Sequence, residues 1–191
     1  ATGQGGAIYN PSTMTINNSQ FSGNKANGES NDIYNEGSLT FESGTTTLEG
    51  GITGSGTATV SEGATLENGT ESKINQTTIT VSGTVTNKNG TDGAITVSDK
   101  VEVTGTGVIT SSANAITATN GIENEGTYNV TGGTNTNKIS GAGRINIAGE
   151  VGNKREIEQG TVEVLEGAEL TNEGIIKSEN VIRNRGTITS S

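Results

Sequence analysis

Short blocks of sequence recur along this chain, and this internal repetition constrains the fold more than any other feature. The block at residues 8–16, IYNPSTMTI, matches residues 33–41, IYNEGSLTF, at an offset of 25 positions (33 − 8). Residues 33–41 recur again as residues 122–130, IENEGTYNV. A longer frame, Gly-Thr-x-x-Val-x-Glu-Gly-Ala-x-Leu-x-Asn, occurs at residues 56–68 and 160–172. Identities at such long offsets indicate repeated structural units that stack on one another.

A smaller unit runs through these blocks: an apolar residue, any residue, then Asn, with Gly close behind. Asn and Gly tolerate a positive φ better than other residues, so we expect each unit to end a short strand at a tight corner. The unit occurs at Ile33/Asn35/Gly37, Leu66/Asn68/Gly69, Val85/Asn87/Gly90, Ile122/Asn124/Gly126, Leu170/Asn172/Gly174 and Ile182/Asn184/Gly186.

The apolar residues are mostly Ile and Val in alternating runs such as Thr78-Ile79-Thr80-Val81, which is typical of strands with one face inward. No apolar stripe with helical spacing lasts more than one turn, so we expect essentially no helix. The best helical candidate, residues 153–159, spans only about two turns. We interpret it as a charged surface strand or loop.

Strands of three to five residues between sharp corners, in imperfect periods of about 20 to 25 residues, predict an all-β parallel β-helix, or β-solenoid. At that period the chain forms roughly seven to nine rungs in a single domain, residues 1–191. Only 28% of the residues are hydrophobic. A narrow solenoid needs few hydrophobic residues, because each rung has only a small number of inward-facing positions. A β-sandwich of antiparallel hairpins is the alternative architecture.

The two copies of the longer frame predict which side chains point inward. Equivalent positions should lie on equivalent sides of the coil, since a slip of one residue would exchange the two faces of a strand. We expect Val60, Leu66, Val164 and Leu170 to be buried. The glutamates of the frame should be exposed: Glu62, Glu67, Glu166 and Glu169.

The composition excludes several kinds of catalytic, metal-binding and nucleic-acid-binding sites. The chain has no His and no Cys, so Ser-His-Asp and Cys-His catalysis, Cys/His zinc sites and disulfides are excluded. Its net charge of −10 opposes nucleic-acid binding, which needs clustered Lys and Arg. No apolar run is long enough to span a membrane, and residues 1–10 lack the pattern of a signal peptide.

Three sequence features resemble sites but are better explained as structure. Glu156 and Glu158 have the i, i+2 spacing of a carboxylate pair, yet they lie beside Lys154 and Arg155 without an aromatic residue to hold a sugar. Residues 89–93, NGTDG, resemble part of a calcium loop but lack its remaining ligands, so we interpret them as a turn. The glycine patterns at residues 54–56, 105–107 and 141–143 have no following helix to bind a phosphate, so we interpret them as corners. We therefore predict no catalytic, cofactor or metal residues.

The N-terminal region carries a more specific pattern. Gly5-Gly6-Ala7-Ile8, followed by Phe21-Ser22-Gly23-Asn24, resembles the paired GGAI and FxxN motifs of polymorphic outer-membrane proteins, which are autotransporters. The pattern divides the chain into a GGAI/FxxN-type region, residues 1–41, and Thr/Gly/Asn-rich coils, residues 42–191. The resemblance implies a right-handed β-helix passenger, exported across the outer membrane to the bacterial cell surface. From the residues themselves we expect Gly5 and Gly6 at a corner, with Ile8 inward. Phe21 should fill one end of the coil, and Asn24 should hydrogen-bond along a ladder of backbone groups.

Repeat architecture without catalytic groups favours a non-enzymatic structural or adhesive module of the cell surface. Its partner would be a receptor or glycan on a host or neighbouring cell, bound by an extended lateral face rather than a pocket. One alternative is a self-assembling extracellular fibre subunit, because the ends of a solenoid expose strand edges to a second chain. Another is a glycan-processing β-helix enzyme, either a lyase or a hydrolase.

Overall fold

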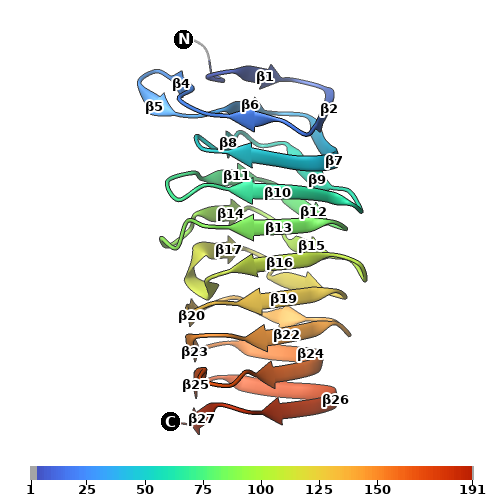
Figure 1. Ribbon diagram of the computed structural model, residues 1–191, viewed down its shortest axis with the longest axis vertical. Helices are drawn as coiled ribbons and strands as arrows, with labels where there is room; N and C mark the ends of the chain where they lie inside the picture. The colour runs from blue at the N-terminus through green and yellow to red at the C-terminus, as the bar shows by residue number, and fades with distance from the viewer. Residues whose placement is uncertain (1–3, 191) are drawn as a thin grey trace.

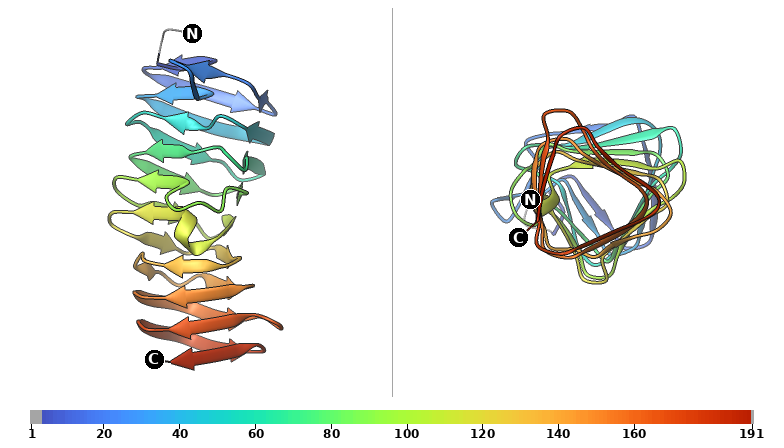
Figure 2. Two further views of the ribbon diagram at one scale, coloured as in Figure 1. Left: turned by 90° about the vertical axis from the view of Figure 1, so that its left-hand side faces the viewer. Right: turned by 90° about the horizontal axis from the view of Figure 1, so that it is seen from below.

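The protein is a stack of β-strand coils of about eight turns, as the computed structural model describes it for residues 4–190 (Figure 1). Residues 1–3 and 191 lie outside the described part. The first and last residues of the expected single domain, residues 1–191, are therefore not described. Every strand pairing among the described residues is parallel except the small hairpin of β4 and β5. The predicted parallel β-solenoid is therefore confirmed. Seen end-on, the coils outline a triangle, so that each coil contributes to three faces (Figure 2).

We number the faces in the order in which the chain visits them. The first face begins with a six-stranded sheet: β1 (Ile8–Asn10), β6 (Ile33–Asn35), β8 (Ile52–Thr53), β11 (Ile74–Gln76), β14 (Ile95–Val97) and β17 (Ile116–Ala118). It continues in a four-stranded sheet: β20 (Gly133–Asn135), β23 (Glu150–Asn153), β25 (Glu169–Asn172) and β27 (Thr187–Ser190).

The second and third faces belong to one fifteen-stranded sheet that bends around a corner. The second face contains β2 (Thr13–Asn17), β9 (Thr57–Val60), β12 (Thr78–Val81), β15 (Val101–Val103), β18 (Ile122–Asn124) and β21 (Ile139–Ser140). The third contains β3 (Gln20–Phe21), β10 (Ala64–Asn68), β13 (Thr84–Asn87), β16 (Val108–Ser111), β19 (Thr127–Val130) and β22 (Arg144–Ile147). Three long strands cross the corner and join the two faces: β7 (Ser38–Leu48), β24 (Glu156–Val164) and β26 (Ile175–Asn184).

Two short elements depart from the regular winding. The hairpin of β4 (Lys25–Ala26) and β5 (Glu29–Ser30) follows the first coil. A single 3-10 turn, η1 (Ala113–Ala115), precedes β17, and the next coil passes against it where Ala113 N donates to Gly132 O at 2.7 Å. No other helical element is present in residues 4–190, as expected for this sequence. No described helix has the length and apolar character needed to cross a membrane.

Stacked apolar side chains fill the interior. On the first face six isoleucines lie in register on six successive strands: Ile8, Ile33, Ile52, Ile74, Ile95 and Ile116. The four residues predicted to be inward, Val60, Leu66, Val164 and Leu170, are all at most 1% exposed. Glu62, Glu166 and Glu169 are exposed as predicted. Glu67 is instead only partly exposed, because it lies along the third face in an ion pair with Lys88 at 2.8 Å.

The longer frame is a corner rather than a whole coil. Its first copy joins β9 to β10 and turns from the second face to the third, whereas its second copy joins β24 to β25 and turns from the third face to the first. Both copies make the same turn. Gly63 and Gly167 have φ of 80° and 77°, and the next residue in each, Ala64 or Ala168, donates its N–H three positions back. One corner sequence therefore serves at two corners of the triangle.

The asparagines of the repeated unit each end a strand at a corner, as predicted, but they do not take a positive φ themselves. Among non-glycine residues in the described range only Asn18 and Asn27 do so. The asparagines of the repeated unit instead point inward, and most are buried. Because an amide group both donates and accepts, it can bond to the same group one coil away. Such side-chain pairs join Asn10 to Asn35 at 2.7 Å, Asn68 to Asn87 at 2.8 Å, Asn135 to Asn153 at 2.9 Å and Asn153 to Asn172 at 2.8 Å.

Candidate functional site

The interior of the solenoid is not a ligand site. Side chains fill it along the whole described length, and a gap beside Ala58, Leu66 and Ile74 has a volume of only about 10 Å³. That is at most room for one water molecule. Any contact with a partner must therefore be made by the outer faces, the corners or the two ends.

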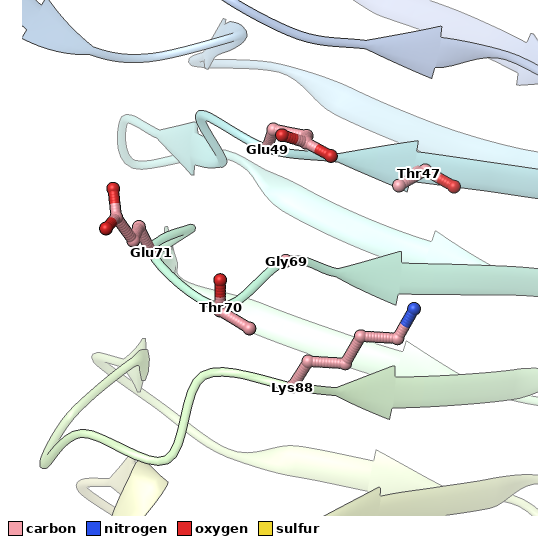
Figure 3. Close-up of a pocket in the computed structure, with 6 residues that line it drawn as sticks. All are labelled: Thr47, Glu49, Gly69, Thr70, Glu71 and Lys88. Atoms are coloured by element: carbon pink, nitrogen blue, oxygen red, sulfur yellow. The ribbon is translucent and has the colours of Figure 1, made fainter.

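A shallow groove of about 250 Å³ lies between coils where the chain leaves the third face (Figure 3). It is lined by Thr47, Glu49, Gly69, Thr70, Glu71 and Lys88. The carboxylates of Glu49 and Glu71 lie apart, and the Lys88 side chain extends away from Glu71 (Figure 3). The Lys88 ammonium donates a hydrogen bond to the carboxylate of Glu67. The groove thus holds charged side chains that do not converge on a common point.

Glu156 and Glu158 lie on β24 and both face outward from the second face, as their spacing predicts. Glu156 accepts a hydrogen bond from Lys177 at 2.6 Å and lies 3.4 Å from Lys138. The hydrogen bond from Lys177 holds the pKa of Glu156 below its ordinary value. A general acid in glycoside hydrolysis needs the opposite shift. The pair is better explained as part of a charged outer face.

Residues 89–93 form a turn, as predicted. Asn89 Oδ1 accepts hydrogen bonds from the N–H of Thr91 and from its hydroxyl, at 3.0 and 2.7 Å. Asp92 accepts a hydrogen bond from Asn114 of the next coil at 2.6 Å. Within residues 4–190 no three carboxylates come together as a cation site would require. The glycine patterns at 54–56, 105–107 and 141–143 all lie at corners between strands, as expected.

The motif residues of the first coil have structural positions. A Cβ on Gly5 would lie 1.8 Å from Ile8 O, and one on Gly6 would lie 2.1 Å from Asn31 O, so both positions need glycine for close backbone approach. Ile8 and Phe21 pack against the core at the N-terminal end. Asn24 does not join a backbone ladder through its side chain. Its amide donates to Oδ1 of buried Asp32 at 2.8 Å.

Asp32 is a buried carboxylate whose role no local sequence pattern indicates. Oδ2 of Asp32 accepts from the backbone N–H of Gly50 and Gly51 at 2.7 and 3.1 Å, while Oδ1 accepts from Asn24. The side chain therefore ties the first coil to the third. Hydrogen bonds satisfy both oxygens, which makes a structural role sufficient to explain its burial.

A second buried carboxylate, Glu163, joins three coils on the third face. Its side chain is 7% exposed and lies between Arg144 at 2.8 Å and Arg185 at 3.3 Å. All three residues stand in different coils, so their pairing depends on the winding and is not visible as a local sequence pattern. The two guanidinium groups offset the cost of burying the carboxylate.

The second face is divided into two chemically different halves. Its N-terminal half carries two adjacent columns of outward hydroxyl groups, which we call the hydroxyl array: Thr13, Ser38, Thr57 and Thr78 in one column, and Thr15, Thr40, Thr59 and Thr80 in the other. Its C-terminal half carries a strip of charged side chains: Lys100, Glu102, Glu123, Lys138, Glu156, Glu158 and Lys177.

Ion pairs run along the charged strip. Lys100 contacts Glu102 at 2.6 Å and Glu123 at 2.7 Å, and these contacts raise the pKa of Lys100 above its ordinary value. Glu156 joins Lys138 and Lys177 in the same way. The charges of the strip thus neutralise one another in part, whereas the hydroxyl array contains no charge at all.

These observations define the chain as a parallel β-solenoid with a closed core and differentiated outer faces. Compared with known proteins, the chain has no significant match to a protein-family model, a curated protein or a solved structure.

Proposed function

We propose that this protein is a non-enzymatic rod of the bacterial cell surface that acts as a structural and adhesive module. The observation that carries the proposal is the filled interior, which leaves three lateral faces, repeated coil after coil, as the extensive surface of the molecule. Weak contacts repeated along such a face, and multiplied over many rods, add up without a deep site. The partner is a receptor or glycan on a host or neighbouring cell.

The N-terminal pattern Gly5–Ile8 and Phe21–Asn24 supports the placement of the rod. Its similarity to polymorphic outer-membrane proteins favours export across the outer membrane as an autotransporter passenger. A stiff solenoid suits that role because each coil stacks on the one before it. The net charge of −10 adds a condition, since anionic cell surfaces should repel the rod unless cations screen or bridge the charges.

Adhesion is tested by coating beads with the protein and measuring their binding to cultured cells, beside the same protein as a soluble monomer. We expect the beads to bind and the monomer to bind far more weakly. Beads coated at equal density with an unrelated acidic protein are the control. Equal binding by both kinds of bead would reject the adhesive role, and tight stoichiometric binding of one small molecule by the monomer would reject the lateral-face model.

Absence of catalysis is tested separately with a panel of plant, mucin and bacterial glycans. We expect no turnover. Turnover that is lost on Glu156→Gln or Glu158→Gln would establish the glycan-processing alternative and identify the pair as its carboxylates.

A second candidate, end-to-end self-assembly, is favoured by the last coil. Ile182 and Ile188 are 48% and 36% exposed, although they continue the inward positions of Val162 and Leu170. In the first coil the inward residues Ile8, Met14 and Phe21 are also only partly buried. The first coil of a second copy would thus continue the stack that joins all other coils. We propose that a second copy of the chain packs on the last coil, in a head-to-tail contact that can extend to a fibre.

Light scattering over a wide range of protein concentrations tests self-assembly. We expect growth with concentration that is abolished by Ile182→Lys combined with Ile188→Lys. Ile175→Lys is the matched control, because Ile175 is 54% exposed but stands in register with outward Glu156. A protein that stays monomeric throughout, or loses assembly equally with Ile175→Lys, would reject head-to-tail stacking.

A further inference from the structure

The hydroxyl array on the second face is a regular two-dimensional lattice. It consists of four successive strand segments, β2, the first part of β7, β9 and β12, each with hydroxyl side chains at two outward positions. The pairing is in register across all four, so that Thr13, Ser38, Thr57 and Thr78 lie over one another, and Thr15, Thr40, Thr59 and Thr80 do the same. The inward residues between them are Met14, Leu39, Ala58 and Ile79, which anchor the strands to the core.

The residues of the array lie at the surface of the protein. Thr13, Thr15, Ser38 and Thr57 are exposed, and the other four are half-buried. Of the eight array hydroxyls, only those of Thr78 and Thr80 form hydrogen bonds within residues 4–190. They bond to Asp99 at 3.5 Å and to Glu102 at 3.3 Å, at the border with the charged strip. The remaining six hydroxyls make no hydrogen bond to the described part of the chain. Seven of the eight residues are threonines, whose branched side chains are stiff at χ1 and hold their hydroxyls in few orientations.

The spacing of this lattice is set by the β-sheet. Neighbouring strands lie about 4.8 Å apart, and residues i and i+2 of one strand are about 6.6 Å apart. Water molecules in ice are held tetrahedrally by O–H···O bonds of about 2.75 Å, which places second-neighbour oxygens about 4.5 Å apart and repeats the lattice about every 7.3 Å along the perpendicular axis. The array therefore matches an ice surface to roughly a tenth in both directions at once.

We propose that the hydroxyl array binds ice. Its hydroxyls would take the places of water oxygens at the crystal surface, while the methyl groups of the threonines would fill the spaces between them. A charged face would instead hold hydration water in orientations that an ice lattice does not contain. The charged strip begins directly below the array, so the ice-binding surface would cover only the N-terminal half of the second face. This role is separate from adhesion to cells and does not depend on it.

The direct test is partition of fluorescently labelled protein into a slowly growing ice crystal, together with inhibition of ice recrystallisation. We expect the wild-type protein to enter or coat the ice and to keep the crystals small. Thr40→Tyr and Thr59→Tyr each place a bulky ring in the middle of the array and should abolish both effects. Tyrosine is favoured in strands, so the fold should be retained, which an unchanged unfolding midpoint would verify.

Thr86→Tyr is the matched control. Thr86 is a half-buried outward threonine on β13 of the third face, in register with Glu67 and Thr110. We expect this variant to bind ice as the wild type does. Exclusion of the wild-type protein from ice would overturn the proposal, and so would equal loss of activity in Thr40→Tyr and Thr86→Tyr. Binding to insoluble cellulose or chitin without binding to ice would assign the array to a crystalline polysaccharide instead.

Discussion

The side-chain amide of Asn124 donates a hydrogen bond to Oε1 of Gln159 at 2.5 Å, although the two residues lie two coils apart. The coil between them has Gly141 at this position, so no side chain intervenes and the longer glutamine reaches across. The same arrangement occurs at another corner, where Asn35 donates to Gln76 over Gly54, also at 2.5 Å. The order Asn, Gly, Gln on three successive coils is thus a repeated way of closing a buried amide ladder.

The first prediction concerns this bridge. Asn124→Ala should lower the free energy of unfolding by about 1–3 kcal/mol, because it leaves the buried Oε1 of Gln159 without its partner. Gln159→Ala should have a similar effect for the reciprocal reason. A double-mutant cycle in urea measures the interaction, which we expect at about 0.5–3 kcal/mol. Strict additivity of the two substitutions would mean that the bridge does not form.

The second prediction tests the register of the coils. Leu66→Ala and Leu170→Ala should each cost about 2–5 kcal/mol, because each removes buried apolar surface and leaves a cavity. Glu169→Ala, at the neighbouring outward position, should change the free energy of unfolding by about 0.5 kcal/mol or less. Denaturant titrations compare the three. Equal losses of stability from Leu170→Ala and Glu169→Ala would mean that the register described for this strand is wrong.

The third prediction separates two reasons for glycine at corners. Gly63 has a φ of 80° with open space around it, so Gly63→Ala should cost about 1–2 kcal/mol, the penalty of a left-handed conformation. Gly54 has a φ of 110°, and a Cβ there would lie 2.2 Å from Asn35 O. Gly54→Ala must also push two coils apart and should cost clearly more. Thermal unfolding of the two variants ranks them, and a smaller loss for Gly54→Ala would contradict the close packing.

The fourth prediction concerns Tyr128, the largest side chain in the core. It is 1% exposed, and its hydroxyl has no hydrogen-bond partner among residues 4–190. Tyr128→Phe should therefore leave the free energy of unfolding unchanged or raise it, since it removes an unsatisfied polar group. Tyr128→Ala should cost about 3–5 kcal/mol through the cavity. Marked destabilisation by Tyr128→Phe would reveal a partner for the hydroxyl.

The same burial predicts a pH dependence. Desolvation raises the pKa of Tyr128 far above its ordinary value, because the buried site disfavours the phenolate. The unfolded chain loses this proton near pH 10, so the stabilisation from a protonated Tyr128 is complete below that pH and falls as the pH rises above it. Tyrosinate absorption should accordingly show Tyr128 titrating only as the protein unfolds. In Tyr128→Phe the alkaline loss of stability should be smaller.

Much of the fold follows from local patterns. The alternation of Thr with Ile or Val in residues 78–81 correctly predicts a strand with Ile79 and Val81 inward, and the frame at residues 56–68 correctly predicts Val60 and Leu66 in the core. The burial pattern is readable because a strand alternates strictly between its two faces. The roles of the corner residues are less accessible. Asn35 and Asn124 each end a strand at a corner, as the repeated unit predicts, but the unit does not show that their side chains bond to another coil.

The hydroxyl array and the ion pairs of the third face also could not be predicted from local sequence. The sequence shows that Thr13, Ser38, Thr57 and Thr78 each begin an alternating run, but nothing local shows that they lie over one another. The separations along the chain vary from coil to coil, so no fixed period assigns them to one column. In the same way Arg144, Glu163 and Arg185 are unremarkable as single charges and become an ion ladder only after winding.

The sequence by itself therefore determined the strands, their inward and outward sides and the class of fold, because these depend on side-chain alternation and on turns of a few residues. Only the tertiary structure decided which coil lies over which and on which face each corner falls. The longer frame makes this plain, since nearly the same residues turn from the second face to the third at 56–68 and from the third to the first at 160–172. Hydrogen bonds between coils fix that registration, and they join residues about twenty positions apart through contacts that no short stretch of sequence contains.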